Sequence, residues 1–399
     1  MTFKSQVKSK ARMVAVGLAF SAVVLGGVVA PQRASAQQAV KNGFMLPYSG
    51  TFAALGEAIT NGFKMAIEEN GGTLGGRKIE YFTVDDASDP SKAVDNASRL
   101  VKRDDVDAII GTVHSGVAMA LSKVARESGK LLIVPNAGTD EVTGVMCAPN
   151  VFRTSFSNWQ PSYAMGNVVA ESGHKTVVTL SWKYAAGEQM VKGFKESFEA
   201  KGGKVLKELY LPFPTVEFQP LLTEIASLKP DAVYVFFAGG GAVKFVQDYA
   251  AAGLKERTPL YGSGFLTDGT LDAQGASADG LHTTLHYADG LDIERDRKFR
   301  AAYLKAFNKE ADVYAVQGYD AAQLLIAGAN AVNGDMTKKN ELYSAMRNAK
   351  IDSPRGAFTM SKANNPVQDI YLRKVEGNKN VVVSVASKAL EDPARGCKM

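Results

Sequence analysis

The sequence predicts an α/β protein made of two doubly wound lobes, and three observations predict it. Short apolar runs rich in β-branched residues alternate with amphipathic helical patterns. The alternation occurs twice, before and after a proline-containing link at residues 148–162. The last hundred residues instead show helices followed by short strands. Because strand–helix alternation favours parallel sheets covered on both faces, we expect two such lobes, with the end of the chain crossing between them.

The first 36 residues are predicted to be a secretory signal. Basic residues precede an apolar run at 13–30, and the small residues Ala34 and Ala36 follow it, which is typical of cleavage after Ala36. The alternative is an uncleaved membrane anchor, for which the run is long enough. Five of the 46 basic residues lie in this segment, which leaves 41 basic against 41 acidic residues. The balance gives no reason to expect binding to nucleic acid or to a membrane surface.

The elements of the remaining chain follow from the spacing of apolar residues. We expect strands at residues 78–85, 106–112, 130–135, 174–181, 203–211, 231–237 and 258–263. We expect helices at residues 54–70, 91–103, 115–128, 186–201, 218–228, 241–254, 295–309, 313–333 and 338–348. Short strands are expected near 357–360, 367–375 and 380–386. Asp89 can cap the second helix, and Pro90 suits its first turn.

The enzyme signatures that we tested are missing from the sequence. It contains no G-x-S-x-G, H-E-x-x-H or G-x-x-x-x-G-K-[ST] motif. His282 and His286 are four positions apart, but the residues between them favour a strand, which lacks helical metal-ligand geometry. The glycines at 239–241 follow a strand, yet Lys244 replaces the third small residue of a dinucleotide fingerprint. We therefore expect no catalytic residues, no metal and no cofactor.

Polar turns after the strands are the candidate binding elements. Ser115 lies at a predicted helix start beside His114, where free N–H groups favour an anion. The alternative is that Ser115 only caps its own helix. Asn136 to Thr139 and the turn at Ala238–Gly239 follow two other strands and can act in the same way.

The two cysteines, Cys147 and Cys397, allow one pairing. In an exported protein such a pair can oxidise, so we expect a disulfide that holds the end of the chain near position 147. Two unconnected thiols are the alternative.

The motifs together resemble a known family. P-x-S-G-x-x-A-x-x-G (47–56), GGTLGGRKIE, DDASDP, VFRTS and GYDAAQ (318–323) are similar to those of type I periplasmic solute-binding proteins of ABC transporters, in the leucine/isoleucine/valine-binding branch. The resemblance implies a monomeric periplasmic receptor that closes on a small ligand through three hinge crossings and docks onto a membrane permease. We expect lobe 1 at 37–157 plus 287–357, lobe 2 at 158–286 plus 358–386, and a tail at 387–399.

The resemblance also implies roles for individual residues. In the amino-acid binders, the serine matching Ser115 and the turn matching Asn136–Thr139 bind the ligand carboxylate. An acidic residue matching roughly Ser263 pairs with the ammonium group, but here it is serine. Tyrosines expected near Ala186 and Ala238 are also absent. Because an ammonium group buried without a counter-charge is costly, the pocket should prefer an acid without an amine.

We therefore expect a benzoate-like aromatic carboxylate in a wide apolar slot between the lobes, with Phe237 and Trp182 near it. The expected ligand-binding residues are Phe52, Leu55, His114, Ser115, Asn136, Ala137, Gly138, Thr139, Tyr184, Ala238, Gly239, Ser263 and Phe265. One alternative is a branched-chain amino acid or small amide, with Asp268 as the amine partner. The other is a periplasmic sensory subunit that presents its ligand to a signalling receptor.

Overall fold

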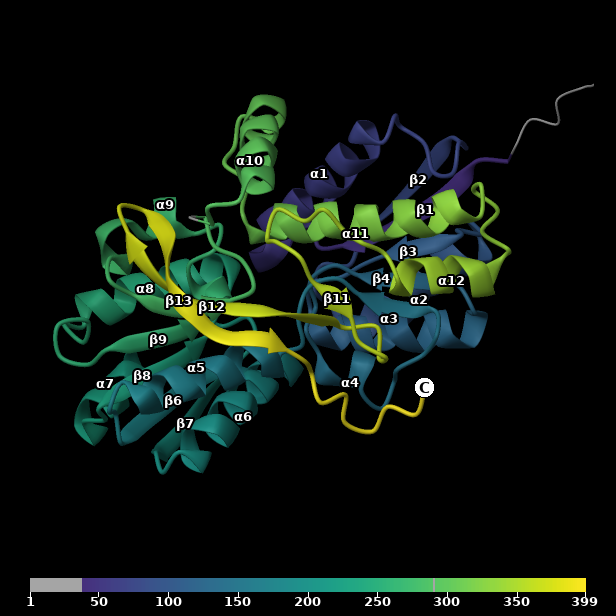
Figure 1. The fold of residues 1–399 in the computed structure, drawn as a ribbon. Coiled ribbons are helices and arrows are strands. Elements are labelled where there is room, and N and C mark those ends of the chain that lie inside the picture. Colours follow the sequence, from purple (N-terminus) through teal and green to yellow (C-terminus); the bar gives the residue numbers. More distant parts are fainter. Residues whose placement is uncertain (1–37, 290) are drawn as a thin grey trace, which may run out of the picture. The chain divides into compact units, whose positions relative to one another are not determined.

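The computed structural model describes residues 38–289 and 291–399, and it contains two separate sheets (Figure 1). The expected signal and its cleavage site lie outside these residues. Within the described ranges, every helix is too short or too polar to span a bilayer.

The sheet of lobe 1 has five parallel strands in the order β2-β1-β3-β4-β5. Its strands are β1 (Val40–Leu46), β2 (Ile79–Asp85), β3 (Ala108–Ile110), β4 (Leu131–Val134) and β5 (Val151–Arg153). The helices that belong to this lobe are α1 (Ala53–Glu69), α2 (Pro90–Lys102), α3 (Ser115–Ser128), α4 (Asp140–Thr143), α10 (Glu294–Phe307), α11 (Val313–Ala331) and α12 (Lys339–Arg347). A short 3-10 helix, η1 (Gly50–Phe52), precedes α1. The strands at 40–46 and 151–153 and the helix at 159–171 are additional to those expected from the sequence.

The sheet of lobe 2 is mixed. Strands β6 (Thr176–Lys183), β7 (Lys204–Pro212), β8 (Ala232–Phe236), β9 (Leu260–Ser263) and β10 (His282–Leu285) are parallel. The antiparallel strands β11 (Thr359–Met360), β12 (Pro366–Glu376) and β13 (Lys379–Leu390) complete it. Its helices are α5 (Trp159–Glu171), α6 (Ala185–Ala200), α7 (Gln219–Leu228), α8 (Gly239–Ala251) and α9 (Leu271–Gln274), with the 3-10 helices η2 (Gly264–Leu266) and η3 (Gly275–Ala278).

The last strand is longer than the sequence predicts. β13 continues to Leu390, past residue 386, so the segment expected as a tail from 387 begins inside a strand. Register shifts in its pairing with β12 let the strand bend and continue. Its exposed face carries Val383 and Val385, which hides the alternation of apolar and polar residues that marks a strand.

Helix α1 packs closely against α11, which returns to lobe 1 from lobe 2. A Cβ atom at Gly62 would come within 1.9 Å of the Ala315 carbonyl oxygen, and one at Gly318 within 1.9 Å of that of Ile59. The two glycines therefore let the helix backbones touch. This contact gives the GYDAAQ motif a packing role, because Gly318 is its first residue.

The crossing segments are held together by buried hydrogen bonds. Arg355 donates to the carbonyl oxygens of Thr154 and Ser155 and forms an ion pair with Asp320. Gln368 also donates to the Ser155 carbonyl oxygen, at 2.6 Å. The VFRTS motif thus lies where separate chain crossings meet.

The predicted disulfide is confirmed. Cys147 and Cys397 are bonded, with their Cα atoms 5.5 Å apart across 250 positions of sequence. The bond fixes the segment after β13 to the segment between α4 and β5.

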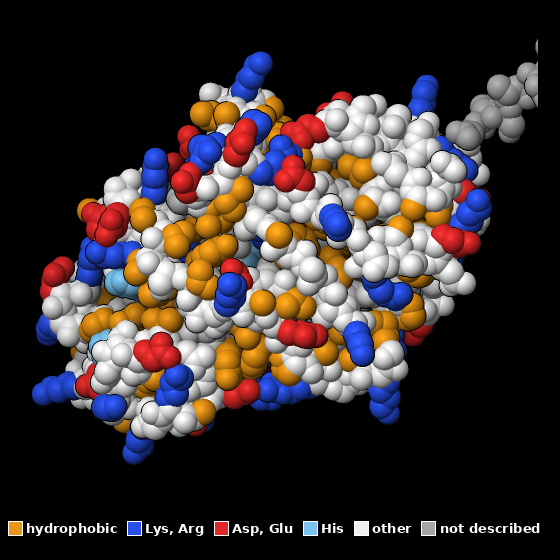
Figure 2. Space-filling model, viewed as in Figure 1, with side chains coloured by type: hydrophobic (Ala, Val, Ile, Leu, Met, Phe, Trp, Pro, Cys, Tyr) orange, Lys and Arg blue, Asp and Glu red, His pale blue; other side chains and the backbone are white. Residues whose placement is uncertain are grey.

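The helix cap predicted at Asp89 is also confirmed. Asp89 accepts from the Ser91 N–H, and Pro90 begins α2. On the face shown in Figure 2, acidic and basic side chains are interspersed, which agrees with the balanced composition.

Candidate functional site

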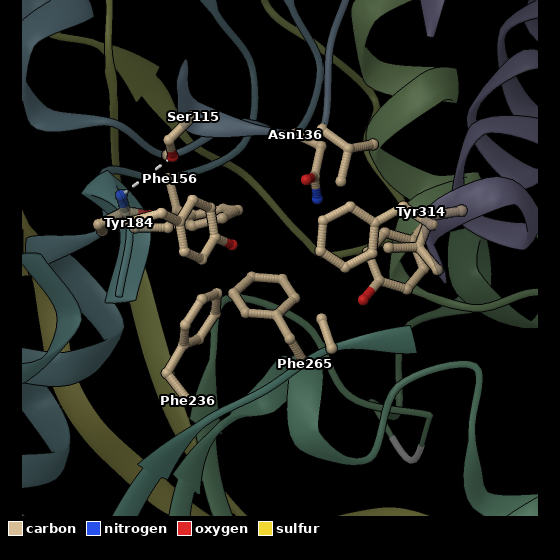
Figure 3. Close-up of a pocket in the computed structure, with 14 residues that line it drawn as sticks. Ser115, Asn136, Phe156, Tyr184, Phe236, Phe265 and Tyr314 are labelled. Atoms are coloured by element: carbon tan, nitrogen blue, oxygen red, sulfur yellow. Dashed lines mark hydrogen bonds between the residues drawn. The ribbon is translucent and has the colours of Figure 1, made fainter. Parts of the chain in front are cut away.

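A cavity of about 310 Å³, its mouth included, lies between the two lobes at the carboxyl ends of their strands (Figure 3). This is the usual position for ligands of parallel α/β sheets. Its lining residues are Phe52, Leu55, Val113, Ser115, Asn136, Gly138, Phe156, Asn158, Tyr184, Ala186, Phe236, Ala238, Phe265 and Tyr314. All of these side chains are uncharged.

Phenylalanine rings form much of the cavity wall. The rings of Phe156 and Phe265 lie 4.7 Å apart, and the edge of Phe236 meets Phe265 at 6.2 Å between centroids. Ala186 and Ala238, where larger side chains would fill space, complete the wall. Such a wall suits a flat apolar ring, which can stack on aromatic neighbours.

Several helices begin at the cavity, α3, α6 and α8 among them. Ser115 is the first residue of α3, Tyr184 precedes α6, and Ala238 precedes α8, and all three line the cavity. The first N–H groups of a helix lack intrahelical partners and carry partial positive charge. The site can therefore stabilise an anion without a cationic side chain.

The cap of α3 is His114, so the alternative role for Ser115 is wrong. His114 Nδ1 accepts from the Gly116 N–H at 3.1 Å. Ser115 Oγ instead accepts a long hydrogen bond from Asn158 Nδ2 at 3.5 Å. Since Ser115 Oγ is the acceptor in this bond, its own proton can be donated to a ligand.

His114 lies behind the wall and supports it. Burial lowers the pKa of His114 to about 4, so the ring is neutral at pH 7. Because Nδ1 accepts a hydrogen bond, the proton of the neutral ring is on Nε2. The ring stacks on Tyr184, with centroids 4.7 Å apart. His114 is thus placed to orient Tyr184.

Two tyrosine hydroxyls and an amide add polar groups to the cavity. Asn136 Nδ2 donates to Gln317 Oε1 at 2.7 Å, which fixes the amide. Figure 3 shows the hydroxyls of Tyr184 and Tyr314 directed toward the cavity. Burial raises the pKa of both tyrosines, so both hydroxyls keep their protons.

The expected site residues divide into two groups. Those that line the cavity are Phe52, Leu55, Ser115, Asn136, Gly138, Tyr184, Ala238 and Phe265. Those that lie behind it are His114, Ala137, Thr139, Gly239 and Ser263. The Ala137 N–H donates to the Thr112 carbonyl oxygen, and the Thr139 hydroxyl donates to Glu141. These two residues therefore shape the turn after β4 from behind.

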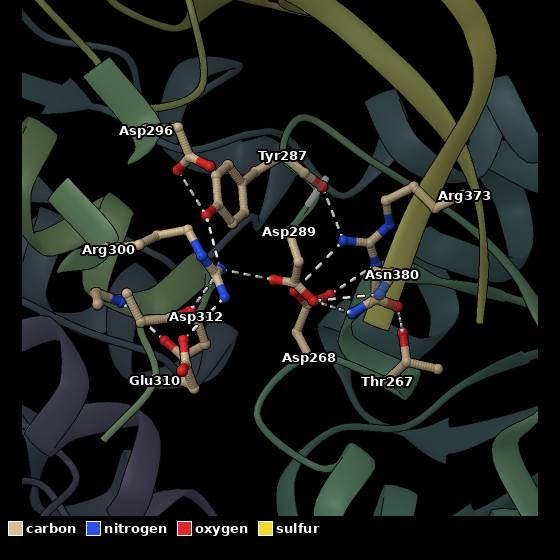
Figure 4. Close-up of polar contacts among 12 residues, drawn as sticks. Thr267, Asp268, Tyr287, Asp289, Asp296, Arg300, Glu310, Asp312, Arg373 and Asn380 are labelled. Atoms are coloured by element: carbon tan, nitrogen blue, oxygen red, sulfur yellow. Dashed lines mark hydrogen bonds and ion pairs between the residues drawn. The ribbon is translucent and has the colours of Figure 1, made fainter. Parts of the chain in front are cut away.

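Neither candidate partner for a ligand amine faces the cavity. Ser263 is fully buried, and its hydroxyl lies 3.2 Å from the Tyr234 hydroxyl. Both carboxylate oxygens of Asp268 accept from Arg373, at 3.3 and 2.6 Å (Figure 4). No acidic side chain lines the cavity in the part of the chain that the structure describes. An ammonium group there would have no counter-charge.

Strand alternation explains the correction at Phe237. Phe236, not Phe237, faces the cavity, because neighbouring residues of an extended chain point to opposite faces. Phe237 packs behind it against Trp182, Phe218 and Phe245. Trp182, which we expected near the slot, is also buried in this core.

Sequence reasoning also missed Val113, Phe156, Asn158 and Tyr314, whereas Ala186, which it named as a small residue that widens the slot, does line the cavity. Val113 directly precedes His114, so its place in the same turn is a signal from which it could have been predicted. Phe156 and Asn158 belong to the crossing segment, and Tyr314 is the second residue of α11, after the cap at Asp312. These last three positions reach the cavity only because the chain crosses between the lobes, and no local pattern marks that.

The two lobes touch beside the cavity. Gly239 has a φ of +55°, and a Cβ atom there would come within 2.3 Å of the Thr51 carbonyl oxygen. Gln189 of α6 accepts from the Asp140 N–H at 3.0 Å and from Asn158 Nδ2 at 2.8 Å. The cavity walls are thus joined by direct contacts from α6 and α8 to lobe 1.

Two α/β lobes around a small cavity define the class of two-lobed ligand receptors. The chain belongs to the periplasmic binding protein family, whose model matches residues 39–380. It is 30% identical over 345 residues to Leu/Ile/Val-binding protein homolog 6 of Brucella melitensis, a match that covers 84% of this chain and 87% of that protein.

Solved structures give further similarity. A solute-binding protein of an ABC transporter from R. palustris, in complex with benzoate, is 53% identical, with a TM-score of 0.89 over 91% of this chain and all of that one. Another, from Rhodopseudomonas palustris BisB5 in complex with 3,4-dihydroxybenzoic acid, is 32% identical, with a TM-score of 0.84 over 89% of this chain and 99% of that one.

Proposed function

We propose that this protein is the receptor of an ABC uptake system and binds a small aromatic carboxylate in the cavity between its lobes. The observation that carries the proposal is the cavity itself. Phenylalanine rings offer a slot for an aromatic ring, and three helix starts with the Ser115 hydroxyl offer donors to a carboxylate. The benzoate and dihydroxybenzoate complexes of the two similar proteins support this ligand class.

An amino acid is the competing ligand, because the Brucella relative is named as a Leu/Ile/Val-binding homologue. The cavity argues against it. Ser263 is bonded inside the core and Asp268 is paired with Arg373, so neither offers a charge to an ammonium group. Burying that group without a partner would cost several kcal/mol, roughly enough to abolish useful affinity.

Calorimetric titration tests the ligand class. The purified protein is titrated with benzoate, 4-hydroxybenzoate and leucine, after unfolding and refolding to remove any bound ligand. We expect saturable binding of at least one aromatic acid and none of leucine. Binding of leucine without either aromatic acid would overturn the proposal.

The transport role extends the same proposal. We infer that the chain is exported with cleavage after Ala36, acts as a monomer, and delivers its ligand to a membrane permease without chemical change. We also infer that the lobes comprise 37–157 with 287–357 and 158–286 with 358–390, the last boundary moved from 386 to the end of β13. We infer that they close through crossings near 155–160, 285–288 and 356–360. N-terminal sequencing of the periplasmic protein tests the cleavage site, and deletion of the gene should abolish uptake of the aromatic acid.

A further inference from the structure

The hydroxyl of Tyr314 is a buried polar group whose partner is not in the protein. Tyr314 lines the cavity and is fully buried. Its hydroxyl has no hydrogen-bond partner among residues 38–289 and 291–399. Buried hydroxyls are nearly always paired, since an unpaired one loses its bonds to water without replacement. A ligand group that donates to or accepts from this hydroxyl would satisfy it.

The backbone around Tyr314 does not compete for that role. Tyr314 is the second residue of α11, and the preceding Asp312 accepts from the Ala315 N–H at 2.9 Å. The cap satisfies the helix start, and the tyrosine ring extends from it into the cavity, where Figure 3 shows the hydroxyl. A hydrogen-bond partner for the Tyr314 hydroxyl can therefore come from a ligand in the cavity.

The two ends of the cavity differ in electrostatic character. At one end, Ser115 begins α3, where the helix dipole is positive. At the other end, burial raises the pKa of the Tyr314 hydroxyl, and the carboxyls of Asp268 and Asp312 add to this while Arg373 opposes it, so the hydroxyl stays neutral. The first end therefore attracts a ligand carboxylate, and the second offers a neutral hydroxyl. Figure 3 shows Ser115 and Tyr314 on opposite sides of the cavity, so the ring of an acid whose carboxylate binds at Ser115 would extend toward Tyr314.

We propose that Tyr314 is a specificity-determining residue that hydrogen-bonds a hydroxyl group on the ligand ring, remote from the carboxylate. The preferred ligands are then hydroxybenzoates rather than unsubstituted benzoate. This inference rests on the proposed function and narrows its ligand class. A phenolic hydroxyl fits because it can both donate to and accept from the tyrosine hydroxyl.

Titrations of the wild-type protein and Tyr314→Phe with benzoate, 3-hydroxybenzoate and 4-hydroxybenzoate test the inference. The wild type should bind at least one hydroxybenzoate about tenfold more tightly than benzoate, the effect of one good hydrogen bond. In Tyr314→Phe this preference should vanish, with benzoate affinity changed less than about twofold. The matched control is Tyr184→Phe, which removes the other tyrosine hydroxyl of the cavity and should keep the preference.

Two results would overturn the inference and leave the proposed function intact. One is a wild-type protein that binds benzoate as tightly as both hydroxybenzoates. The other is an equal change for all three acids in Tyr314→Phe, with unchanged thermal unfolding. If the wild type binds none of the acids, the proposed function fails and this inference fails with it.

Discussion

The cavity and the charged network around Asp268 and Arg373 are both largely buried, but their polar groups are satisfied in opposite ways. The network comprises Asp268, Asp289, Asp296, Arg300 and Arg373, and each of these charged groups meets an opposite charge or a hydrogen-bond partner (Figure 4). In the cavity, uncharged groups such as the Tyr314 hydroxyl remain without a protein partner. The difference indicates that the network maintains the fold, while the cavity leaves its bonds to a ligand.

Breaking the network should have the largest effect on stability. Arg373→Met leaves Asp268 buried without its cation, which should destabilise the protein by about 3–5 kcal/mol. Chemical denaturation measures the loss. The matched control is Arg395→Met, which removes the half-exposed pair with Glu196 and should cost less than about 1 kcal/mol. Equal losses in the two variants would contradict the distinction between the network and the surface.

Removing a cavity hydroxyl should affect binding instead of stability. Ser115→Ala should weaken binding of an aromatic carboxylate by about 1–3 kcal/mol, because one donor to the anion is lost. The free energy of unfolding without ligand should change little, since Ser115 does not cap α3. Titration and denaturation of the same sample check both points. An unchanged dissociation constant would exclude Ser115 from the site.

Asp312, which caps α11 two residues before Tyr314, should make the stability of the protein depend on pH. Burial raises the pKa of its carboxyl to about 7, against 3.8 for an ordinary aspartate. Between these values the folded state holds a proton that the unfolded state releases, so stability falls as pH rises from about 4 to 7. Asp312→Asn keeps a capping group but removes the titration.

The stability difference between wild type and Asp312→Asn should therefore change with pH. It should shift against the wild type by at most about 1.4 kcal/mol per pH unit as pH rises. Denaturation at several pH values measures the slope. A constant difference from pH 4 to 7 would show that Asp312 keeps an ordinary pKa.

Two neighbouring phenylalanines give the smallest and most local test. Phe236→Leu should weaken ligand binding by about 1 kcal/mol through lost ring contact, with little change in stability. Phe237→Leu should show the reverse, a stability loss of about 1 kcal/mol from the core behind the strand. Parallel titration and thermal unfolding of both variants check the assignment. The opposite pattern would mean that strand β8 presents the other face to the cavity.

The sequence by itself determined the alternation of strands and helices, the caps at Asp89–Pro90 and the polar turns that follow β3 and β4. These features depend on neighbouring residues, so local periodicity and turn chemistry report them directly. The disulfide was also predictable, because only one pairing of two cysteines exists. The turn at Ser115 indicates that the ligand is an anion, and the small side chains of Ala186 and Ala238 indicate that it contains a flat ring.

Only the tertiary structure decided which side chains share the cavity. Phe156, Asn158 and Tyr314 come from segments that cross between the lobes. At the end of β8, the side chain of Phe236 points into the cavity and that of Phe237 points away from it. Asp268 cannot act as the partner of a ligand amine, because it pairs with Arg373, more than one hundred positions away. These outcomes depend on contacts between segments that are distant in the sequence. The free energy of burying and pairing side chains decides which contacts form, and no local sequence pattern encodes it.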